Sequence, residues 1–289
     1  MTFAPPETGD IKALVDAALK EDIGSGDITS SAVIPDGTTL KAAMTARQNM
    51  IVAGVPVVLA IVDRLAVDSD IDILHRDGDA VAAGDVIMRI SGPARGILTA
   101  ERTALNSLQF LSAIATWTNR FCQAIKGSKA TLLDTRKTVP GLRGLSKYAV
   151  RVGGGSNHRM RLDDGILIKD NHIVVAGSVK AAVTSALAAN TGRVVQVECD
   201  TLDQVREALD AGAERLLLDN MAPDQLRKAV DMVRGRVPLE ASGGVNLKTI
   251  RAIAETGVDY ISVGSLTQSA PAVDIGLDYL EWKAGVDGQ

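Results

Sequence analysis

The strongest constraint on this fold is a series of short apolar segments, each of which ends in polar residues and is followed by a helical pattern. Six such segments follow Lys129, and they read TLLDTRK, GILIKDNH, VVQVECD, RLLLDNM, VPLEASGG and DYISVGS. Strands that alternate with helices usually pair in parallel, and the helices then cover the sheet. The sequence therefore predicts an α/β domain over residues 116–271 whose parallel sheet closes into a barrel.

A different pattern precedes this series. Residues 11–21 predict a short amphipathic helix, and residues 40–98 contain β-rich runs between Gly-Asp turns, with one helix expected at residues 55–65. Residues 99–125 carry apolar side chains at helical spacing. We therefore predict a smaller, β-rich α+β domain over residues 1–115 and a long helix that joins it to the barrel.

Composition excludes several classes of protein. Of the 289 residues, 46% are hydrophobic, and the net charge of −4 argues against general nucleic-acid binding. No stretch reaches the roughly 18 apolar residues of a membrane span, and the N-terminus has no basic and apolar leader. Cys122 and Cys199 have no CxxC spacing, so neither a disulfide framework nor a zinc site is indicated. We expect a cytoplasmic enzyme without nucleic-acid or membrane partners.

Positive charge is concentrated in one part of the chain. Between Arg136 and Lys169 there are eight basic residues and two acids, a local excess of six positive charges. Such an excess suits an anionic substrate, although a run of charges is also typical of a solvated face. The two interpretations remain equally good for four of these residues: Arg143, Lys147, Arg151 and Arg161.

The ends of the predicted strands carry most of the chemically useful groups. In an α/β barrel these ends and the loops after them surround one mouth, so side chains from different strands converge there. The groups at the six strand ends are Arg136, Lys169, Glu198, Asp219, Ser242 and Gly264. Arg136, Arg159 and Lys169 are suited to carboxylate or phosphate oxygens, and the His158 imidazole is a further hydrogen-bond donor.

Two glycine-containing turns follow the last two strands, EASGGVN and SVGSLTQ. Small residues at these positions let backbone N–H groups approach an anion, which predicts a phosphate site, although Gly-Gly also serves simple tight turns. Glu198 and Asp219 end adjacent strands and could converge on Mg²⁺, a cation that prefers oxygen ligands. The alternative is that each carboxylate pairs with Lys137 or Lys169.

Longer motifs extend over nearly the whole chain. They are EDIGSGDITS, TARQNMIVAG, TAERTALNSLQFLSAIAT, DTRKTVPGLRGLSKYAVRVGGGSNHRMRLDDGILIKDNH, VECDTLDQ, LLLDNM, LEASGGV and ETGVDYISVGSLTQSAPAVDIGLD. With these motifs the chain resembles the type II phosphoribosyltransferases, specifically the quinolinate phosphoribosyltransferase family. The DTRKT segment with the NHR and IKDNH segments is long and specific.

The resemblance implies a fold and a reaction. The fold is an incomplete, seven-stranded α/β barrel with a β-rich N-terminal domain, which a C-terminal helix near residues 272–289 completes. The reaction transfers the phosphoribosyl group of phosphoribosyl pyrophosphate to quinolinate with decarboxylation, giving nicotinate mononucleotide, CO₂ and pyrophosphate in NAD biosynthesis. The resemblance further implies Mg²⁺ as cofactor and a homodimer, with a hexamer as the alternative.

Roles for single residues also follow from the resemblance, position by position. The quinolinate carboxylates would bind Arg102, Arg136, His158, Arg159 and Lys169, and Arg102 would enter the neighbouring subunit's site. Lys137 would hold phosphoribosyl pyrophosphate, and Glu198 and Asp219 would face the ribose and Mg²⁺-pyrophosphate. Lys137, Lys169, Glu198 and Asp219 are thus the expected catalytic residues. The 5-phosphate would bind Ser242, Gly243, Gly244, Val263, Gly264 and Ser265.

Three other interpretations depend on particular residues. A molybdenum-transport-associated relative shares the TRKT and HR segments but typically lacks the lysine of IKDNH, which is Lys169 here. A Schiff-base aldolase would use Lys169 as its nucleophile. A lipoyl-type carrier is suggested by DGDAVAAGDVIMRISGP, but no lysine lies between Lys41 and Lys126 to be modified.

Overall fold

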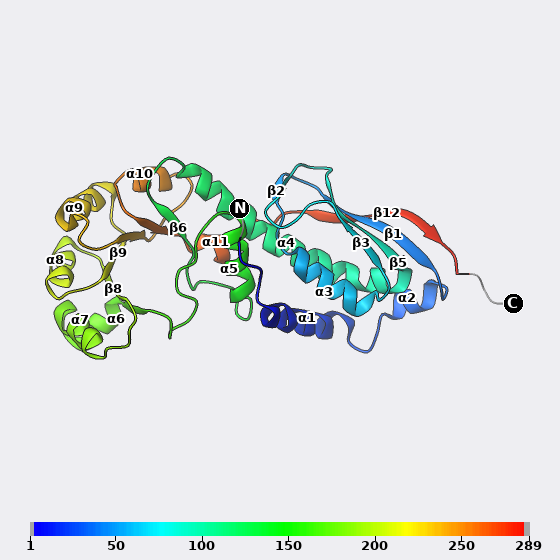
Figure 1. Cartoon of the computed structure of the whole chain (residues 1–289), viewed down its shortest axis with the longest axis horizontal. Helices are drawn as coiled ribbons and strands as arrows, with labels where there is room; N and C mark the ends of the chain where they lie inside the picture. The colour runs from blue at the N-terminus through cyan, green and yellow to red at the C-terminus, as the bar shows by residue number, and fades with distance from the viewer. Residues whose placement is uncertain (1–2, 286–289) are drawn as a thin grey trace. The chain divides into compact units, whose positions relative to one another are not determined.

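The computed structural model describes residues 3–285, and the chain divides into two compact units (Figure 1). The first unit comprises the described residues up to Asn119, the segment Val139–Gly154 and the chain from Ala270 onward. The second unit comprises Arg120–Thr138 and Gly155–Ser269. The predicted boundary between residues 115 and 116 assigns Val139–Gly154 to the barrel domain, whereas in the structure this segment belongs to the first unit.

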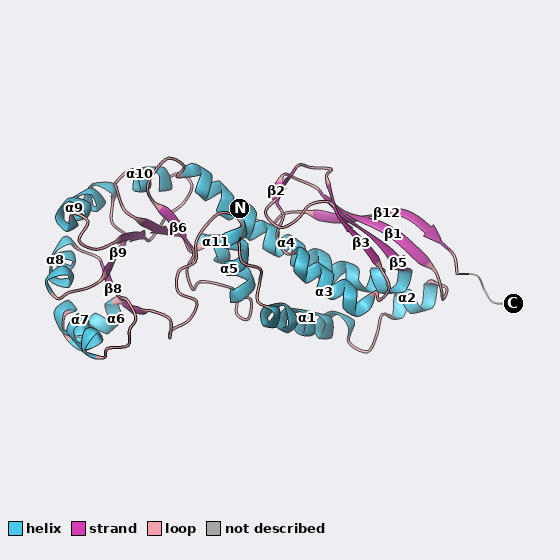
Figure 2. Cartoon of the chain, in the orientation of Figure 1, coloured by secondary structure: helices cyan, strands magenta, loops and turns pink. Residues whose placement is uncertain are grey.

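The first unit is built on a four-stranded antiparallel sheet, in the order β12-β1-β5-β3 (Figure 2). Its strands are β1 (Thr39–Ala46), β3 (Asp70–Ile73), β5 (Val86–Pro93) and β12 (Ile275–Lys283), and β2 (Met50–Ile51) and β4 (Ala80–Val81) form a separate pair. Its helices are α1 (Thr8–Ile23), α2 (Ile28–Val33), α3 (Val55–Leu65) and α5 (Arg143–Val152). The helix α4 (Ala94–Ala124) begins in this unit and ends in the second.

Helix α3 confirms the helix predicted at residues 55–65, and local chemistry explains its start. Gly54 precedes it at a φ of 110°, which a side chain would disfavour, and the Asp77 carboxylate accepts the backbone N–H groups of Gly54 and Val55 at 3.0 and 2.9 Å. The buried face of α3, with Ile61 in it, contributes to the apolar core of the unit together with Met44 of β1. Figure 2 shows α1, α3 and α4 on one side of the sheet.

The C-terminal helix expected near residues 272–289 is wrong for the part that the structure describes. Residues Ile275–Lys283 form β12, which pairs antiparallel with β1 from Ile275 opposite Ala46 to Lys283 opposite Thr39. A strand along β1 satisfies backbone groups that would otherwise form an open edge, and residues such as Tyr279 and Trp282 favour strands. Residues 286–289 of the expected helix lie outside the described residues.

The second unit contains all six predicted strands, in one parallel sheet ordered β6-β11-β10-β9-β8-β7. They are β6 (Thr131–Leu133), β7 (Ile166–Ile168), β8 (Val195–Cys199), β9 (Arg215–Asp219), β10 (Leu239–Ser242) and β11 (Tyr260–Ser262). A seventh strand is not found among the described residues. Beside β6, Ser156 makes a single parallel bridge to Leu133, so only a fragment of pairing continues there.

Helices connect these strands and lie outside them, as Figure 1 shows for α7, α8 and α9. They are α6 (Asp170–Ala176), α7 (Val179–Ala188), α8 (Leu202–Asp210), α9 (Pro223–Val233), α10 (Ile250–Ala254) and α11 (Ser265–Gln268). Alternate strand residues such as Val197, Leu216 and Leu218 are fully buried, and they are apolar as the predicted pattern requires. Within residues 3–285, no helix combines the length and apolar character of a membrane-spanning helix.

Candidate active site

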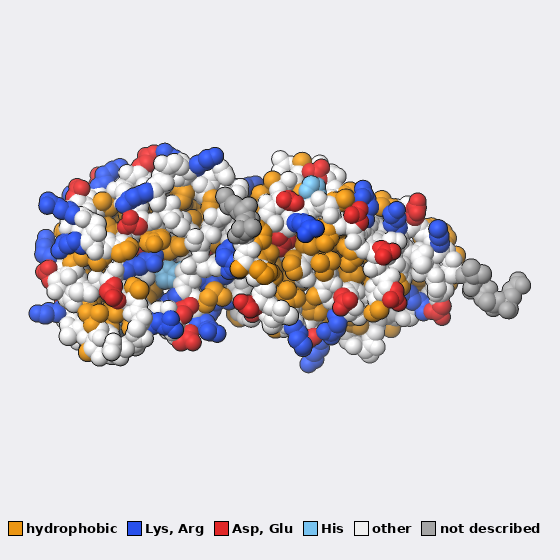
Figure 3. Space-filling model, viewed as in Figure 1, with side chains coloured by type: hydrophobic (Ala, Val, Ile, Leu, Met, Phe, Trp, Pro, Cys, Tyr) orange, Lys and Arg blue, Asp and Glu red, His pale blue; other side chains and the backbone are white. Residues whose placement is uncertain are grey.

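A pocket of about 350 Å³ lies at the carboxyl ends of the parallel strands, and residues of the second unit alone line it. Its lining residues are Thr135, Arg136, Lys137, His158, Arg159, Leu167, Lys169, Glu198, Leu217, Asp219, Glu240, Ser242 and Ser262. Eight expected site residues are therefore brought together: Arg136, Lys137, His158, Arg159, Lys169, Glu198, Asp219 and Ser242. On the face of the second unit shown in Figure 3, a histidine side chain lies close to Lys and Arg side chains.

Two guanidinium groups are crowded in this pocket. Burial, and then the positive charge of Arg136, lower the pKa of Arg159 below its ordinary value. The Nε atom of Arg136 is buried and has no hydrogen-bond partner among the described residues, whereas Nη1 of Arg159 donates to the Gly165 carbonyl at 2.8 Å. Neighbouring cations with unused donors are suited to a ligand that carries carboxylate or phosphate groups.

A buried carboxylate fastens the loop that carries His158. Asp134, which directly follows β6, is fully buried. Its Oδ1 accepts the backbone N–H of His158 at 2.8 Å, and its Oδ2 accepts the amide of Asn157 at 2.6 Å. Asp134 therefore joins the segment that carries Arg136 to the segment that carries His158, on either side of Val139–Gly154.

A second carboxylate, which lines the pocket, is also buried. Glu240 is fully buried on β10, and its Oε2 atom accepts the Gln196 amide at 2.8 Å and the Arg215 guanidinium at 2.7 Å. Nε2 of His158 lies 3.4 Å from the same oxygen. Burial by itself raises the pKa of Glu240, but the contacts with His158, Arg215 and Gln196 outweigh it and hold the pKa below its ordinary value.

The other acids of the pocket lie at the ends of β8 and β9. Nζ of Lys169 is 2.8 Å from Oε2 of Glu198, so the pairing of Glu198 with a lysine, which is the alternative to a magnesium role, is present. Asp219 accepts the side-chain amide of Asn220 at 2.6 Å. Within the described part of the chain, no group of three or more His, Cys, Asp or Glu side chains is arranged to hold a metal.

The two glycine-containing turns follow β10 and β11. Gly243 has a φ of 90°, and a Cβ atom there would collide with the side chain and backbone nitrogen of Asn220. A Cβ at Gly264 would lie 3.1 Å from the Lys137 side chain, so this turn is adjacent to a cation of the pocket. Of the six residues expected to hold a phosphate, Ser242 alone lines the pocket, while Gly243, Gly244, Val263, Gly264 and Ser265 belong to the same two turns.

Several basic residues of the 136–169 region do not line this pocket. Arg143, Lys147 and Arg151 lie on α5 in the first unit, and Lys147 is fully buried, so a solvated face does not describe it. The Arg151 guanidinium packs over the Tyr148 ring at 5.6 Å. Arg161 is exposed and pairs with Asp163. Arg102 is exposed on α4 and also belongs to the first unit.

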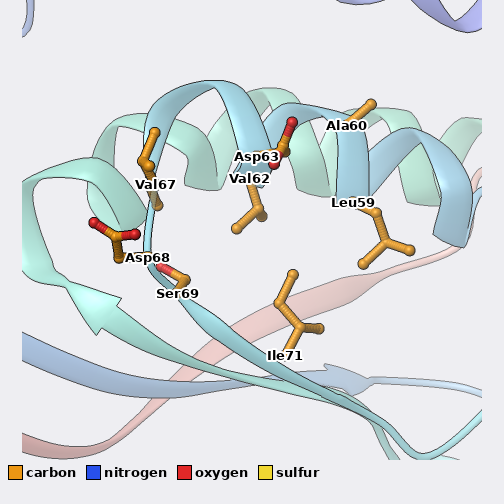
Figure 4. A pocket seen from close by; sticks show the side chains of 9 residues that line it. Leu59, Ala60, Val62, Asp63, Val67, Asp68, Ser69 and Ile71 are labelled. Atoms are coloured by element: carbon orange, nitrogen blue, oxygen red, sulfur yellow. The ribbon is translucent and has the colours of Figure 1, made fainter.

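A second hollow, of about 390 Å³, lies in the first unit between the end of α3 and β3 (Figure 4). Its charged lining residues are two acids, Asp63 and Asp68, and the rest are mostly apolar, such as Leu59 and Ile71. Without a cation, this hollow is unsuited to an anionic substrate. The pocket of the second unit is therefore the candidate active site.

Sequence reasoning missed Glu240 and gave Asp134 no role of its own. An acid inside the apolar run VPLEASGG is a signal of a buried, paired carboxylate, since an unpaired one would be costly there. The pattern does not reveal its partners, because Gln196 and Arg215 come from other strands.

Models of two protein-domain families match the chain. The family described as "Quinolinate phosphoribosyl transferase, N-terminal domain" matches residues 27–112. The family described as "Quinolinate phosphoribosyl transferase, C-terminal domain" matches residues 114–278. Together the two matches cover most of the sequence.

Individual proteins are similar over nearly their full length. A Mycobacterium leprae protein named nicotinate-nucleotide pyrophosphorylase (carboxylating) is 45% identical over 267 residues, covering 90% of this chain and 94% of that protein. A Bacillus subtilis protein named as a probable enzyme of the same kind is 42% identical over 271 residues, covering 93% of each. The solved structure of the Francisella tularensis nicotinate-nucleotide pyrophosphorylase has a TM-score of 0.92 and 41% identity, covering 96% of this chain and 98% of that one.

Proposed function

This chain belongs to the quinolinate phosphoribosyltransferase family, and from that membership we propose how its pocket carries out the family reaction. The enzyme transfers the phosphoribosyl group of phosphoribosyl pyrophosphate to quinolinate with decarboxylation, a step of NAD biosynthesis. It is a pentosyltransferase that releases nicotinate mononucleotide, CO₂ and pyrophosphate. One observation carries the proposal for this pocket. Arg136 and Arg159 line it close to each other, and Nε of Arg136 has no hydrogen-bond partner among the described residues.

Quinolinate is a dianion, and the proposed site for its carboxylates is the cationic side of the pocket. Arg136, His158, Arg159 and Lys169 surround it. Two guanidinium forks offer several N–H donors at fixed angles, which suits adjacent carboxylates on a flat ring. Lys169 forms an ion pair with Glu198. To bind a quinolinate carboxylate, its ammonium group would either leave Glu198 or contact both carboxylates at once.

Phosphoribosyl pyrophosphate would lie along the opposite side. Lys137 would bind its phosphates, and the turns after β10 and β11 would hold the 5-phosphate through Ser242, Gly243, Gly244, Val263, Gly264 and Ser265. The missing side chain at Gly264 supports this assignment, because a Cβ atom there would lie 3.1 Å from the Lys137 side chain, and small residues in such turns let backbone N–H groups approach an anion.

Glu198 and Asp219 would face the ribose. When pyrophosphate departs, positive charge develops at the ribose C1, and two carboxylates stabilise such charge electrostatically. The pyridine nitrogen of quinolinate then attacks C1. The positive nitrogen stabilises the electron pair left at C2 when CO₂ leaves, and a proton from water then adds at C2 to give nicotinate mononucleotide. The protein therefore mainly positions the reactants.

Magnesium fits the carboxylate pair, because Mg²⁺ is commonly bound through one or two carboxylates together with substrate phosphates and water. Glu198 and Asp219 would hold it directly, or through water or pyrophosphate. When bound, the ion neutralises charge on the departing pyrophosphate. Omission of Mg²⁺ is therefore expected to abolish turnover.

We propose a dimer because Arg102, an expected quinolinate-binding residue, belongs to the first unit, whereas residues of the second unit alone line the pocket. An exposed arginine of a partner subunit would complete the cationic side of the pocket. A hexamer built from such dimers would leave this arrangement unchanged. The seventh strand of the family barrel would lie at the Ser156 bridge beside β6.

A direct assay tests the function. Purified protein is incubated with quinolinate, phosphoribosyl pyrophosphate and Mg²⁺, and nicotinate mononucleotide and CO₂ are measured, with nicotinate as the control substrate. Product from quinolinate but not from nicotinate is expected. Absence of turnover by folded protein would favour the molybdenum-associated relative, and borohydride trapping of a carbonyl substrate at Lys169 would favour the aldolase.

A further inference from the structure

The roles proposed above leave one ionisable residue of the pocket unused. Glu240 is fully buried and lines the pocket, and its Oε2 atom lies 3.4 Å from Nε2 of His158. Withdrawing a carboxylate from water is unfavourable unless its partners compensate. The contacts of its two oxygen atoms indicate the role of this carboxylate.

The partners of Glu240 are distributed unevenly. A carboxylate that served only to neutralise Arg215 would be expected to bind the guanidinium with both oxygens. Instead the amide of Gln196, the guanidinium of Arg215 and Nε2 of His158 all approach Oε2. Oε1 has no hydrogen-bond partner among the described residues, and the Arg215 guanidinium also stacks over the Tyr260 ring at 4.1 Å. Glu240 is therefore not paired with Arg215 alone, and the oxygen that all three donors approach is the one near His158.

Hydrogen bonds also fix which ring nitrogen of His158 carries the proton. The backbone N–H of Arg159 donates to Nδ1 at 2.7 Å, so Nδ1 presents a lone pair. In a neutral imidazole the hydrogen is then on Nε2, which faces Glu240. Both ring nitrogens are engaged by the protein, and the ring thereby connects Glu240 to the backbone of Arg159.

We infer that Glu240 is a positioning residue for the binding of quinolinate. Glu240 holds His158 as the Nε2–H tautomer, and His158 in turn fixes the backbone of Arg159 beside Arg136. His158 then shapes the quinolinate side of the pocket through its fixed ring, and the guanidinium groups bind the carboxylates. The inference rests on the proposed function for its substrate, but the hydrogen-bond chain itself does not depend on any substrate.

Nuclear magnetic resonance tests the chain of hydrogen bonds without substrate. The protein has three histidines, so labelling with ¹⁵N-histidine gives three ring systems, and a His158→Gln variant assigns the relevant one. At about pH 8 an ordinary histidine is neutral, and its tautomer can be determined from the ring nitrogens. We expect His158 to show the Nε2–H tautomer with a slowly exchanging ring proton. The Nδ1–H tautomer would overturn the inference.

Two substitutions at Glu240 separate hydrogen bonding from charge. In Glu240→Gln the amide oxygen can accept the same three donors, and the amide nitrogen takes the place of Oε1, where no partner is lost. Its His158 ring proton should remain protected and shift upfield, because the acceptor is neutral. In Glu240→Met the protected proton should disappear. A protected proton that is unchanged in folded Glu240→Met protein would contradict the inference.

A matched control is Gln196→Met. Gln196 is buried and donates to the same Oε2 atom as Arg215, so its loss perturbs the same region of the core. We expect it to lower thermal stability while leaving the His158 tautomer and its protected proton as in the wild type. Loss of the protected proton in this control as well would show only a general loosening of the core and would overturn the specific role of Glu240.

Kinetics test the positioning role. Glu240→Met should raise KM for quinolinate on the order of tenfold, comparable with the loss of an outer partner that orients a metal-bound histidine, with KM for phosphoribosyl pyrophosphate unchanged. Glu240→Gln, which keeps an acceptor for His158, should raise it less. If Glu240 acts through His158, the double variant His158→Gln/Glu240→Met should have no higher KM for quinolinate than His158→Gln alone. Additive effects would overturn the inference, as would an unchanged KM in folded Glu240→Met protein. If the wild-type protein shows the expected His158 resonances but does not turn over quinolinate, the proposed function is wrong and the hydrogen-bond chain still stands.

Discussion

At the scale of residues, two buried carboxylates hold the segment that carries His158 and Arg159. Asp134 binds the backbone and the neighbouring amide, and Glu240 binds the ring. Charged hydrogen bonds in a site screened from water are strong, and they leave little freedom to the groups they hold. The cations that face the pocket are thus positioned before any substrate binds, which lowers the entropic cost of binding.

Arg136→Ala should weaken quinolinate binding. Removing a guanidinium that binds a carboxylate costs about 1.5–3 kcal/mol, which corresponds to a roughly ten- to hundredfold rise in KM. Steady-state kinetics with each substrate varied in turn would measure it. Arg161→Ala is the matched control, since Arg161 is an exposed arginine that pairs with Asp163 and does not line the pocket. Equal effects of the two substitutions would argue against a specific role for Arg136.

The pKa of Glu240 predicts a pH dependence of stability. Its contacts hold the folded-state pKa below the ordinary value of 4.5, so folding favours the charged form. The resulting stabilisation is present above pH 4.5 and is lost as the pH falls through the lower folded-state value. The difference in Tm between wild type and Glu240→Gln should therefore be largest near neutrality and shrink below pH 4.5. An equal difference at both pH values, measured by thermal unfolding, would contradict this.

Polar residues at strand ends could be predicted from the sequence, whereas the buried polar network could not. Arg136, Lys169 and Glu198 stand where a regular alternation of strands and helices must bring them to one edge. The partners of Glu240 depend on how β8, β9 and β10 are aligned, because this alignment decides which side chains of the three strands lie next to each other. That register is set by the packing of the whole sheet, and no local pattern encodes it.

At the scale of elements, the turn after β10 is constrained by the turn after β9. Gly243 has a left-handed backbone, and Asn220 of the preceding turn fills the space where a side chain would lie. The backbone N–H of Asn220 also donates to the Ser242 carbonyl at 2.9 Å. Two adjacent loops at the pocket mouth therefore support each other's conformation.

Gly243→Ala should disturb the proposed phosphate site. A left-handed conformation costs a residue with a side chain about 1–3 kcal/mol, and the collision with Asn220 adds to it. KM for phosphoribosyl pyrophosphate should rise, while KM for quinolinate changes little.

The control for this substitution is Gly235→Ala. Gly235 has a φ of 73°, and nothing lies within 4 Å of a Cβ atom there, so it tests the cost of conformation alone. Unfolding and kinetics of the two variants would be compared. If the two variants have the same unfolding free energy and the same KM for phosphoribosyl pyrophosphate, the turn after β10 neither requires glycine for packing nor binds phosphate.

The elements themselves were largely predictable, because the strands of the parallel sheet are marked by apolar runs and by the polar residues that end them. The exception is β12. Its residues become a strand because β1 offers an unpaired edge, and that edge is formed by residues more than two hundred positions earlier in the chain. A pattern read within a short window contains no information about such a partner.

At the scale of the whole molecule, the proposed dimer makes a specific prediction. Arg102→Ala protein and Lys169→Ala protein should each be inactive, but co-expression should restore activity. In a random mixture half of the dimers are mixed, and each mixed dimer contains one site assembled from two intact halves, so about a quarter of wild-type activity is expected. Activity no higher than that of the single variants would show that Arg102 does not act across subunits.

The pairing of β12 with β1 has a consequence for synthesis of the protein. The ribosome releases β1, β3 and β5 early, and the entire second unit follows before residues 275–283 exist. During that interval the edge of β1 has no permanent partner, and an open strand edge readily pairs with another chain. The nascent protein is therefore most prone to aggregate when its second unit has already been synthesised, and a chaperone that shields this edge would act at that stage.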